Sequence, residues 1–397
     1  MSAWKVSRAV CMLSGVVLLA LALATTRALA DDFDIDLDEG VKYRSRDGDF
    51  AFALGGRWHY DGADFQGNET PLGDDWSTRR LRLSLSMDVL DDWRFAVQYD
   101  LLDEQEPWES LWLRYKGYKQ LFITAGQFPE PFGLEPLTSS NTITFLERAL
   151  PTALTPDTHV GIMLSSRATR WSGALGVFWQ TYIGDDDRFA ARAGMGLTGR
   201  MTVSPVAEIG RVLHLGVSVS LRSPNENGRV RFRTRPESGI ADVHLVDTGR
   251  IGHVDHFVCG GLEAAWISGA WSLQGEYIGA TVYREDDLEP EPFQGGYVYA
   301  SLFLTGERRP YVAARGGFGA VKPQRAYGAW EIAVRRSFLD LNGRTVFGGR
   351  EDNLTWGINW YLHPALRLMF NYTRVNTDPH ADDDDFDILQ MRLQVAI

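Results

Sequence analysis

The sequence predicts an all-β chain that forms a transmembrane antiparallel β-barrel of about sixteen strands over residues 50–397. From Arg80 to Val89 every odd position is apolar and every even position is polar, and the chain repeats this alternation from Leu389 to Val395. Because the side chains of a strand alternate between its faces, one face of these strands would meet lipid or core and the other water. After the first thirty residues no apolar run reaches 18 residues, so a membrane-spanning helix is not expected.

Residues 1–30 are predicted to be a secretory signal peptide. They contain the basic residues Lys5 and Arg8 near the start, an apolar stretch from Val10 to Ala24 and a small-residue cleavage site at Ala28-Leu29-Ala30. A membrane anchor is the alternative, but this stretch is short for a span of roughly 20 residues. Removal of Lys5, Arg8 and Arg27 takes the formal net charge from -12 to -15. Such an acidic exported domain argues against nucleic acid as a partner.

Cysteine and lysine are both scarce in the exported chain. Cys11 lies in the predicted signal peptide, so Cys259 remains alone and no internal disulfide can form. Only five of the 40 basic residues are lysine. The planar guanidinium of arginine suits contact with oxyanions, although a GC-rich genome would produce the same bias.

The exported chain is predicted to start with a short acidic arm, residues 31–49, on the periplasmic side. Segments of period two then recur along the rest of the chain and, with the two described above, make about sixteen strands. The other fourteen lie near residues 52–60, 93–101, 110–115, 121–127, 161–166, 172–180, 191–201, 212–221, 257–266, 271–282, 296–304, 327–335, 354–361 and 366–375. Very short connectors at 91–92, 268–269 and 363–364 indicate tight turns at one rim, with long loops at the other, as in bacterial outer-membrane barrels.

Aromatic residues gather near the predicted strand ends, as at Trp58 and Tyr60 or at Trp356 and Trp360. They fit the aromatic girdles of a membrane barrel, but a soluble sandwich gives the same local pattern. The polar face discriminates between the two. A soluble barrel fills its interior with apolar side chains, whereas these strands alternate arginine, serine, aspartate and glutamine with leucine and valine.

The stretch from Phe128 to Pro156 is too irregular for strands. It contains five prolines and the polar run Thr138-Ser139-Ser140. An irregular loop after an early strand of a large barrel is expected to fold inward and narrow the pore.

Four arginines occupy every second position in the run Arg229, Arg231, Arg233 and Arg235. If the run is extended, all four guanidinium groups face one side at a spacing of about 7 Å. Such a row suits an anion that moves from one arginine to the next. A solvated arginine-rich loop is the alternative, and a barrel with a polar lumen favours the first interpretation.

The sequence resembles the phosphate-selective porin O and P family in blocks spread from residue 54 to the C-terminus. These blocks are 54–57 (LGGR), 79–82 (RRLR), 92–93 (DW), 99–100 (YD), 126–128 (GQF), 132–135 (FGLE), 138–140 (TSS), 146–148 (LER), 304–307 (LTGE), 328–331 (GAWE) and 357–361 (GINWY).

The resemblance implies a trimeric sixteen-stranded porin of the outer membrane whose lumen carries an arginine ladder. In the family, this ladder leads to a constriction where lysines and arginines hold phosphate. The corresponding residues here are Arg229, Arg231, Arg233 and Arg235 in the ladder, Arg57, Arg79 and Arg80 in the basic wall, Arg148 in the inward loop, Glu109 facing the phosphate site, and Lys322.

Departures from the family pattern bear on selectivity. Pro136 and Asn141 stand where the family has lysines, and Lys322 is a single lysine with Arg315 and Arg325 nearby. The resemblance implies a passive anion channel for phosphate or polyphosphate. A general anion channel that also passes chloride, without a high-affinity phosphate site, remains the alternative.

Other classes of protein are less consistent with the sequence. None of the eight histidines stands in a recognisable catalytic motif, so an enzyme is not expected, and an adhesin would have no use for an arginine ladder. The acidic runs 185–187 and 382–385 lack the spaced ligands of a calcium loop. His253-Val254-Asp255-His256 has no cysteine or third histidine close by. We expect no metal or cofactor, and the expected partners are inorganic anions, outer-membrane lipid and further copies of the chain.

Overall fold

The computed structural model describes residues 33–36, 40–67, 72–104, 107–179, 194–224, 227–378 and 385–397. The predicted signal peptide, the acidic run 185–187 and residues 382–384 of the second acidic run lie outside these ranges. Within the described residues, no helix has the length and apolar character needed to cross a bilayer.

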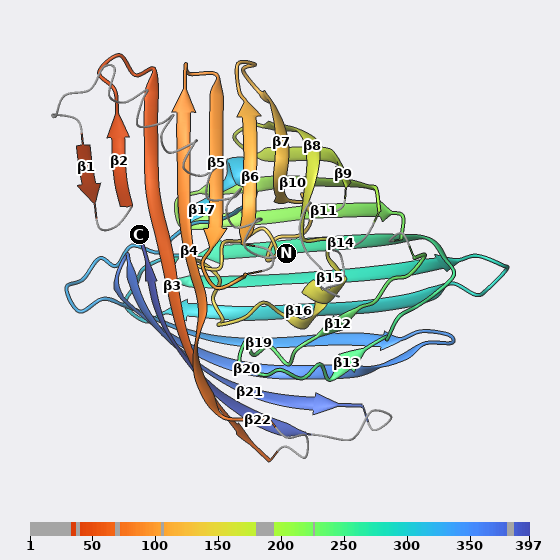
Figure 1. Cartoon of the computed structure of the whole chain (residues 1–397). Coiled ribbons are helices and arrows are strands. Elements are labelled where there is room, and N and C mark those ends of the chain that lie inside the picture. The colour runs from red at the N-terminus through yellow and green to blue at the C-terminus, as the bar shows by residue number, and fades with distance from the viewer. Residues whose placement is uncertain are drawn as a thin grey trace.

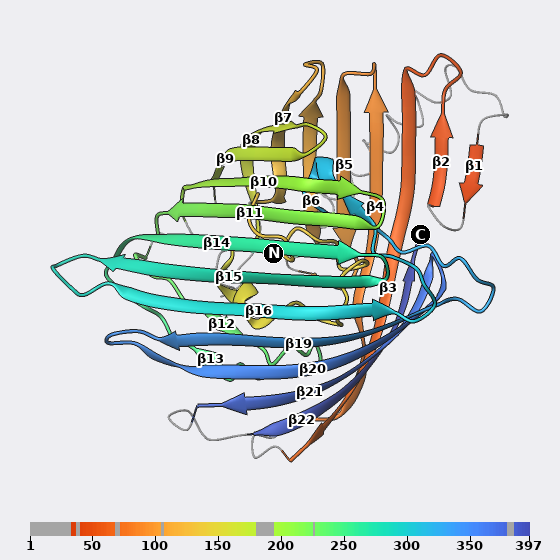
Figure 2. The same ribbon diagram turned by 180° about the vertical axis from the view of Figure 1, so that it is seen from behind.

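Sixteen antiparallel strands form a closed barrel (Figures 1 and 2), which confirms the predicted fold class. The ring closes where β22 pairs with β3, from Asp387 opposite Gln66 to Ala396 opposite Arg57. The strands of the ring are β3 (Phe50–Gln66), β4 (Asp75–Val89), β5 (Trp93–Asp100), β6 (Trp108–Tyr115), β7 (Leu121–Pro129), β8 (Thr158–Arg167), β9 (Trp171–Trp179), β10 (Gly196–Glu208), β11 (Arg211–Arg222), β14 (Val254–Ser268), β15 (Trp271–Arg284), β16 (Glu291–Phe303), β19 (Ala329–Asn342), β20 (Phe347–His363), β21 (Leu366–Thr377) and β22 (Phe386–Ala396).

Two short strands lie beside the ring at its seam. β1 (Phe33–Asp36) pairs with β2 (Gly40–Arg44), and β2 pairs with the first part of β3, from Val41 opposite Leu54 to Arg44 opposite Ala51. The strand β3 therefore has β2 and β22 as successive partners along one edge. The segment predicted as an acidic arm contributes this hairpin (Figure 1).

The barrel is apolar outside and polar inside, and β11 illustrates the pattern. Its outward residues Leu215, Val217, Val219 and Leu221 are exposed. Its inward residues between them are small or polar, and His214, Ser218, Ser220 and Arg222 are buried. A water-soluble barrel would show the opposite distribution, so this outer surface is suited to lipid.

Aromatic residues mark the end of the barrel that has the short turns. On the outer surface, Trp330 stacks on Trp360 with ring centroids 5.0 Å apart, and Trp93 contacts Tyr115 at 4.8 Å. The tryptophans Trp266 and Trp271 flank another of these turns and are exposed. This arrangement is typical of the interfacial girdle of a membrane barrel.

The connections at the two ends of the barrel differ in length. At the turn end, pairs of strands are joined by residues 90–92, 168–170, 209–210, 269–270 and 364–365. The loop end has the long connections 130–157, with the 3-10 helix η1 (Leu150–Leu154), and 223–253, with β12 (Arg233–Thr234) and β13 (Val246–Asp247). This matches the expected asymmetry of short turns and long loops.

One long connection departs from this asymmetry. Residues 304–328 join β16 to β19 at the turn end and contain β17 (Tyr311–Val312), the 3-10 helix η2 (Ala313–Arg315) and β18 (Gly317–Phe318). The hydroxyl of Tyr311 lies 2.6 Å from His214 Nδ1 and 2.7 Å from Ser204 Oγ, both on inward faces of the wall. Arg309 is buried and donates to Gln274 Oε1 at 2.7 Å. Chain therefore enters the lumen from both ends.

Gly126 of β7 lies where only glycine fits. Its φ is +131°, and a Cβ there would lie 2.3 Å from the carbonyl oxygen of Leu111 on β6. We predict that Gly126→Ala lowers the free energy of unfolding by about 1–3 kcal/mol, because the backbone or its neighbour must shift. Urea titration of the detergent-solubilised protein, followed by tryptophan fluorescence, measures this. Gly260→Ala in β14, where a Cβ meets nothing within 4 Å, is the control, and equal losses in both variants would contradict the assignment.

Candidate functional site

The connection 130–157 folds into the lumen and buries its apolar side chains there. Members of this set are exposed by 2% or less: Phe132, Leu134, Ile143, Phe145, Leu146, Ala149, Leu150 and Leu154. Phe132, Leu150 and Leu154 join a core that also contains wall residues such as Phe257 and Ile278. The segment is thus packed against the inner surface of the wall.

Donors on one side of the wall bind the carbonyl oxygens of this segment. These side chains come from four consecutive strands, β19 to β22, and each is buried. The bonds join Arg335 to Glu147 O (3.0 Å), Asn359 to Thr144 O (3.0 Å), Arg367 to Ile143 O (2.8 Å) and Thr144 O (3.1 Å), Arg392 to Leu146 O (2.6 Å), and Gln394 to Asn141 O (3.0 Å). Successive peptide groups are therefore fixed against the wall.

Acceptors on β11 and β15, which precede the donor strands in the ring, bind the amides of the same segment. The Glu276 carboxylate on β15 accepts from Leu134 N at 2.6 Å and from Glu135 N at 2.8 Å. Ser218 Oγ on β11 accepts from Gly133 N at 3.0 Å. The segment is thus held by donors from one group of wall strands and by acceptors from another.

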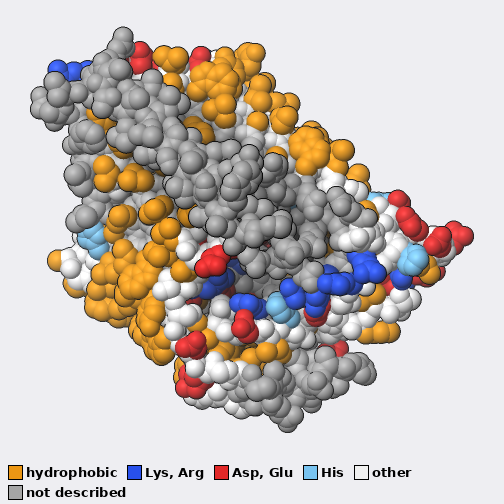
Figure 3. Space-filling model, in the orientation of Figure 1, with side chains coloured by type: hydrophobic (Ala, Val, Ile, Leu, Met, Phe, Trp, Pro, Cys, Tyr) orange, Lys and Arg blue, Asp and Glu red, His pale blue; other side chains and the backbone are white. Residues whose placement is uncertain are grey.

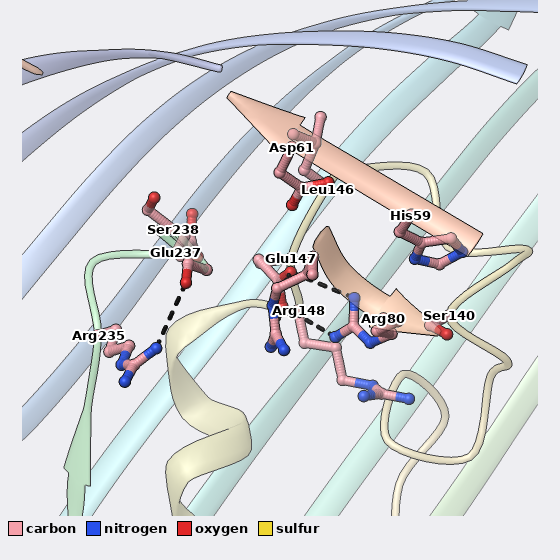
Figure 4. Close-up of polar contacts among 12 residues, drawn as sticks. His59, Asp61, Arg80, Ser140, Leu146, Glu147, Arg148, Arg235, Glu237 and Ser238 are labelled. Carbon is pink, nitrogen blue, oxygen red and sulfur yellow. Dashed lines mark hydrogen bonds and ion pairs between the residues drawn. The ribbon is translucent and has the colours of Figure 1, made fainter. Parts of the chain in front are cut away.

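Glu147 forms ion pairs with three arginines, of which Figure 4 labels Arg80. Its carboxylate binds Arg79 at 3.0 Å, Arg80 at 3.2 Å and Arg392 at 2.8 Å, and Arg392 also binds Asp61 at 2.6 Å. Burial alone would raise the pKa of Glu147, but the three guanidinium groups outweigh it and hold the pKa well below its ordinary value. Glu147 therefore stays charged at neutral pH and neutralises part of the wall's positive charge.

Arg148 and Arg57, both predicted site residues, contact the 130–157 segment. Arg148 donates to the carbonyl oxygens of Glu135, Pro136 and Thr138 at 3.0–3.2 Å. Its guanidinium therefore clamps a turn of the segment. Arg57 on β3 donates to Ser140 Oγ at 2.7 Å.

The structure places Glu109 close to part of the predicted basic wall. Glu109 on β6 forms an ion pair with Arg82 on β4, which also binds Asp100 at 2.7 Å. Arg57 lies within electrostatic range of Arg82, Arg148 and Glu109. These residues from β3, β4, β6 and the inward segment form one mixed-charge group.

The run 229–235 belongs to the connection 223–253 and not to a wall strand. It is extended, with Val230 bridged to Ile251 and β12 paired with β13. Val230 and Phe232 pack into the core inside the lumen, and Phe232 is fully buried. The intervening arginines therefore face away from this core, and Lys and Arg side chains form a row near β12 on the face shown in Figure 3.

The arginines of this run differ in their partners. Arg231 forms a two-point ion pair with Asp247, with Nε 2.8 Å from Oδ1, and Arg235 binds Asp242 at 2.9 Å. Burial would raise the pKa of Asp247, but hydrogen bonds from Arg231 and Gly249 N hold it below its ordinary value. Within the described ranges, the structure has no ion pair or side-chain hydrogen bond from Arg233. Arg229 is exposed.

Solvent reaches the lumen wall mainly along its early strands. Inward residues of β19 to β22, such as Ser337 and Thr373, are buried beneath the inward segments. Their counterparts on β4 to β6, such as Ser84, Gln98 and Ser110, are half-buried. The accessible passage therefore follows β4 to β6 and their neighbours.

A second group of arginines lies along this passage at the turn end, and sequence reasoning missed it. Arg94 on β5 and Arg114 on β6 are direct cross-strand partners. Arg167 on β8 and Arg315 in η2 lie within electrostatic range of Arg114. Like charges opposite each other destabilise a sheet unless something compensates them, and Asp88, 3.9 Å from Arg94, is a weak partner. The alternation of polar and apolar residues in the sequence places both arginines on the polar faces of their strands. It does not give the register of β5 against β6, so it does not show that the two arginines are opposite each other.

Aromatic rings support this turn-end group. The guanidinium of Arg114 lies 4.8 Å from the ring of Trp112, and that of Arg167 lies 4.6 Å from the ring of Phe122. Cation–π contacts hold arginines without neutralising their charge.

The remaining predicted positions are separated by the fold. Lys322 is exposed in the connection 304–328 at the turn end, whereas the run 229–235 enters from the loop end. Asn141, at a position where the family has lysine, lies with its side-chain oxygen 3.1 Å from His59 Nε2. Pro136 contributes only its carbonyl oxygen, to Arg148.

Arg392 should be the most sensitive of these positions in stability measurements. Arg392→Met leaves Asp61 and Glu147 without their shared partner, and loss of one member of a buried ion pair costs about 3–5 kcal/mol. Urea unfolding at neutral pH measures the change. Arg211→Met, at an exposed turn, is the matched control and should change stability little. A loss in Arg392→Met no larger than in the control would contradict the proposed anchoring.

Glu147 should make the stability sensitive to acid. Because its pKa is depressed in the folded state, its contribution is complete above the unfolded-state pKa of about 4.3 and is lost as the pH falls through the lower folded-state pKa. The wild-type protein should therefore lose more free energy of unfolding between pH 5 and pH 3 than Glu147→Gln. Glu208→Gln, at an exposed turn, should behave like the wild type. Equal losses in the wild type and Glu147→Gln would contradict the ion-pair assignment.

Comparison with known proteins agrees with this architecture. Residues 52–397 match the family model described as phosphate-selective porin O and P. Porin O of Pseudomonas aeruginosa is 28% identical over 433 aligned positions, which cover 96% of this chain and 98% of that protein.

Solved structures share the fold at low sequence identity. An anion-selective porin from Comamonas acidovorans superposes with a TM-score of 0.57 at 10% identity, covering 88% of this chain and all of that one. OmpT of Vibrio cholerae, in a structure described as a trimer form, gives a TM-score of 0.53 at 10% identity and covers 88% of this chain and 99% of that one. The family match spans nearly the whole barrel, and the chain therefore belongs to the phosphate-selective porin O and P family of outer-membrane barrels.

Proposed function

We propose that this chain is a passive, anion-selective channel of the bacterial outer membrane that passes phosphate and other inorganic anions down their gradients. The membrane location follows from the family. The matching family and Porin O are porins, which supports a channel and not an enzyme or an adhesin.

The observation that carries the proposal is a set of arginines along the lumen that make no ion pair within the described residues. Within the described residues, Arg233, Arg114, Arg167 and Arg315 make no ion pair. They lie on segments at both ends of the passage, whereas Arg79, Arg80 and Arg231 are bound to carboxylates. Positive charge is thus available at both ends even though the chain as a whole is acidic.

Distributed arginines suit conduction better than one strong site. A channel must attract an ion enough to admit it and hold it weakly enough to release it. Charge-assisted hydrogen bonds contribute roughly 1.5–3 kcal/mol each and replace part of the lost hydration of the anion. Several comparable contacts therefore avoid a trap at any one of them.

Two kinds of channel, which differ in the anion they prefer, are candidates. The family resemblance favours phosphate or polyphosphate. A general anion channel that also passes chloride, without a high-affinity phosphate site, is supported by Arg79, Arg80 and Arg148, because their guanidinium groups already bind Glu147 or backbone carbonyls.

Assembly and orientation are part of the proposal. We infer a homotrimer, supported by the family and by the OmpT structure described as a trimer form. The turn end is assigned to the periplasm and the loop end to the cell exterior, as in bacterial outer-membrane barrels. Residues 1–30 are assigned to a signal peptide and residues 31–49 to a periplasmic arm.

Charge selectivity can be measured from zero-current potentials of channels in planar bilayers under a KCl gradient. The wild-type channel should give the sign that indicates anion preference. Arg233→Ala and Arg114→Ala should each shift the potential towards the cation side, because each removes a lumen charge that no ion pair neutralises among the described residues. Arg211→Ala, which removes a charge at an exposed turn, should leave the potential unchanged. Cation preference in the wild type would overturn the proposal.

Block of chloride current by added phosphate separates the two candidates. A phosphate channel should show saturable block at low phosphate concentration, since bound phosphate delays the passage of chloride. A general anion channel should show only a gradual change as phosphate replaces chloride.

A further inference from the structure

Three potential metal ligands meet at the loop end of the barrel, outside the passage described above. His253 ends the connection that carries the arginine run, and Glu285 and Asp286 follow directly after β15. One ligand atom from each of these side chains lies within 4.8 Å of the others. Figure 3 shows a histidine among acidic side chains at the tip of the molecule, on the side where β15 and β16 are joined in Figure 1.

Strand pairing brings these ligands together, which is why the sequence did not reveal them. Val254 pairs with Arg284, and Glu285 N donates to His253 O at 2.7 Å. The ligands are 32 residues apart in the chain but lie on adjoining ends of neighbouring strands. The nearby pair Asp255 and His256 contact each other at 2.9 Å and do not belong to this group.

The charges around His253 are not balanced by the neighbouring arginine. His253 Nδ1 lies 3.3 Å from Asp286 Oδ2, and Glu285 adds a second carboxylate. Arg284 directs its guanidinium elsewhere, to Gly252 O at 3.3 Å, Thr345 Oγ1 at 3.1 Å and Glu291 at 3.5 Å. Two neighbouring carboxylates repel each other, and a bound cation would relieve this repulsion.

We propose that His253, Glu285 and Asp286 bind one divalent cation of the zinc class at this rim. An imidazole with two carboxylates suits zinc and related transition metals, whereas calcium and magnesium prefer oxygen ligands only. A tetrahedral metal with bonds of about 2.0–2.1 Å needs donors roughly 3.4 Å apart. The three exposed side chains reach that spacing by small rotations, and water completes the coordination.

Metal binding at this position would reinforce the base of the arginine-bearing connection. Val254 N donates to Gly228 O at 3.2 Å, and Ile251 forms a bridge with Val230. The end of the connection at His253 is thereby joined to the start of the arginine run. A metal shared with Glu285 and Asp286 would tie both to the β15–β16 connection.

Isothermal titration of ZnCl2 into the full-length protein, purified in detergent and stripped with EDTA, tests the proposal. We expect one zinc per chain. His253→Ala and Asp286→Asn should each weaken binding more than tenfold, since loss of supporting residues around a metal already costs about 10–100-fold. His256→Ala removes an exposed histidine three residues away, is the matched control, and should bind zinc like the wild type.

Cobalt absorption provides a second readout, because ligand-field bands report an imidazole–carboxylate site directly. These bands should appear in the wild type and in His256→Ala and be absent in His253→Ala. The proposal is overturned if zinc does not bind, if His253→Ala binds it as the wild type does, or if calcium binds equally well to the wild type and His253→Ala. None of these outcomes depends on anion selectivity, so a failure here leaves the channel assignment intact.

Discussion

Peptide groups buried inside the barrel impose the constraint on which the rest of the structure depends. A buried peptide group without a partner costs about 1–3 kcal/mol, and the segment 130–157 carries many such groups into the lumen. Arg367 on β21 and Arg392 on β22 supply donors, and Glu276 on β15 supplies an acceptor. The polar interior thus has two functions, because it lines a passage for ions and also fixes the segment that narrows it.

Arginine serves these two functions at different positions. Where its guanidinium group binds carboxylates or carbonyl oxygens, as at Arg148 and Arg335, it holds chain segments in place and adds little net positive charge to the lumen. Where it rests on an aromatic ring or makes no ion pair, as at Arg114 and Arg233 among the described residues, its charge is available to a passing ion. The abundance of arginine is therefore a poor measure of the positive charge along the path.

Period two was enough to predict the number and order of the wall strands, because a lipid-facing strand repeats its pattern at every second residue, as in Arg80–Val89. The same pattern also predicted that the arginines from Arg229 to Arg235 share one side of an extended run. It did not predict that this run lies in a connection that packs on Phe257. The role of Arg148 and the pairing of Arg94 with Arg114 were not predictable, because contacts between distant segments depend on loop shape and strand register. The same holds for the connection 304–328, whose local sequence does not say at which end of the barrel it lies.

The seam of the barrel has a consequence for how the chain folds. Each wall strand other than the seam pair lies next to its neighbour in sequence, so these contacts can form progressively. At the seam, Gln66 of β3 must find Asp387 of β22, more than 300 residues away. Closing so large a loop carries an entropy cost before any seam hydrogen bond compensates for it. Contact order therefore predicts that closing the ring at the seam is slower than adding neighbouring strands to the wall.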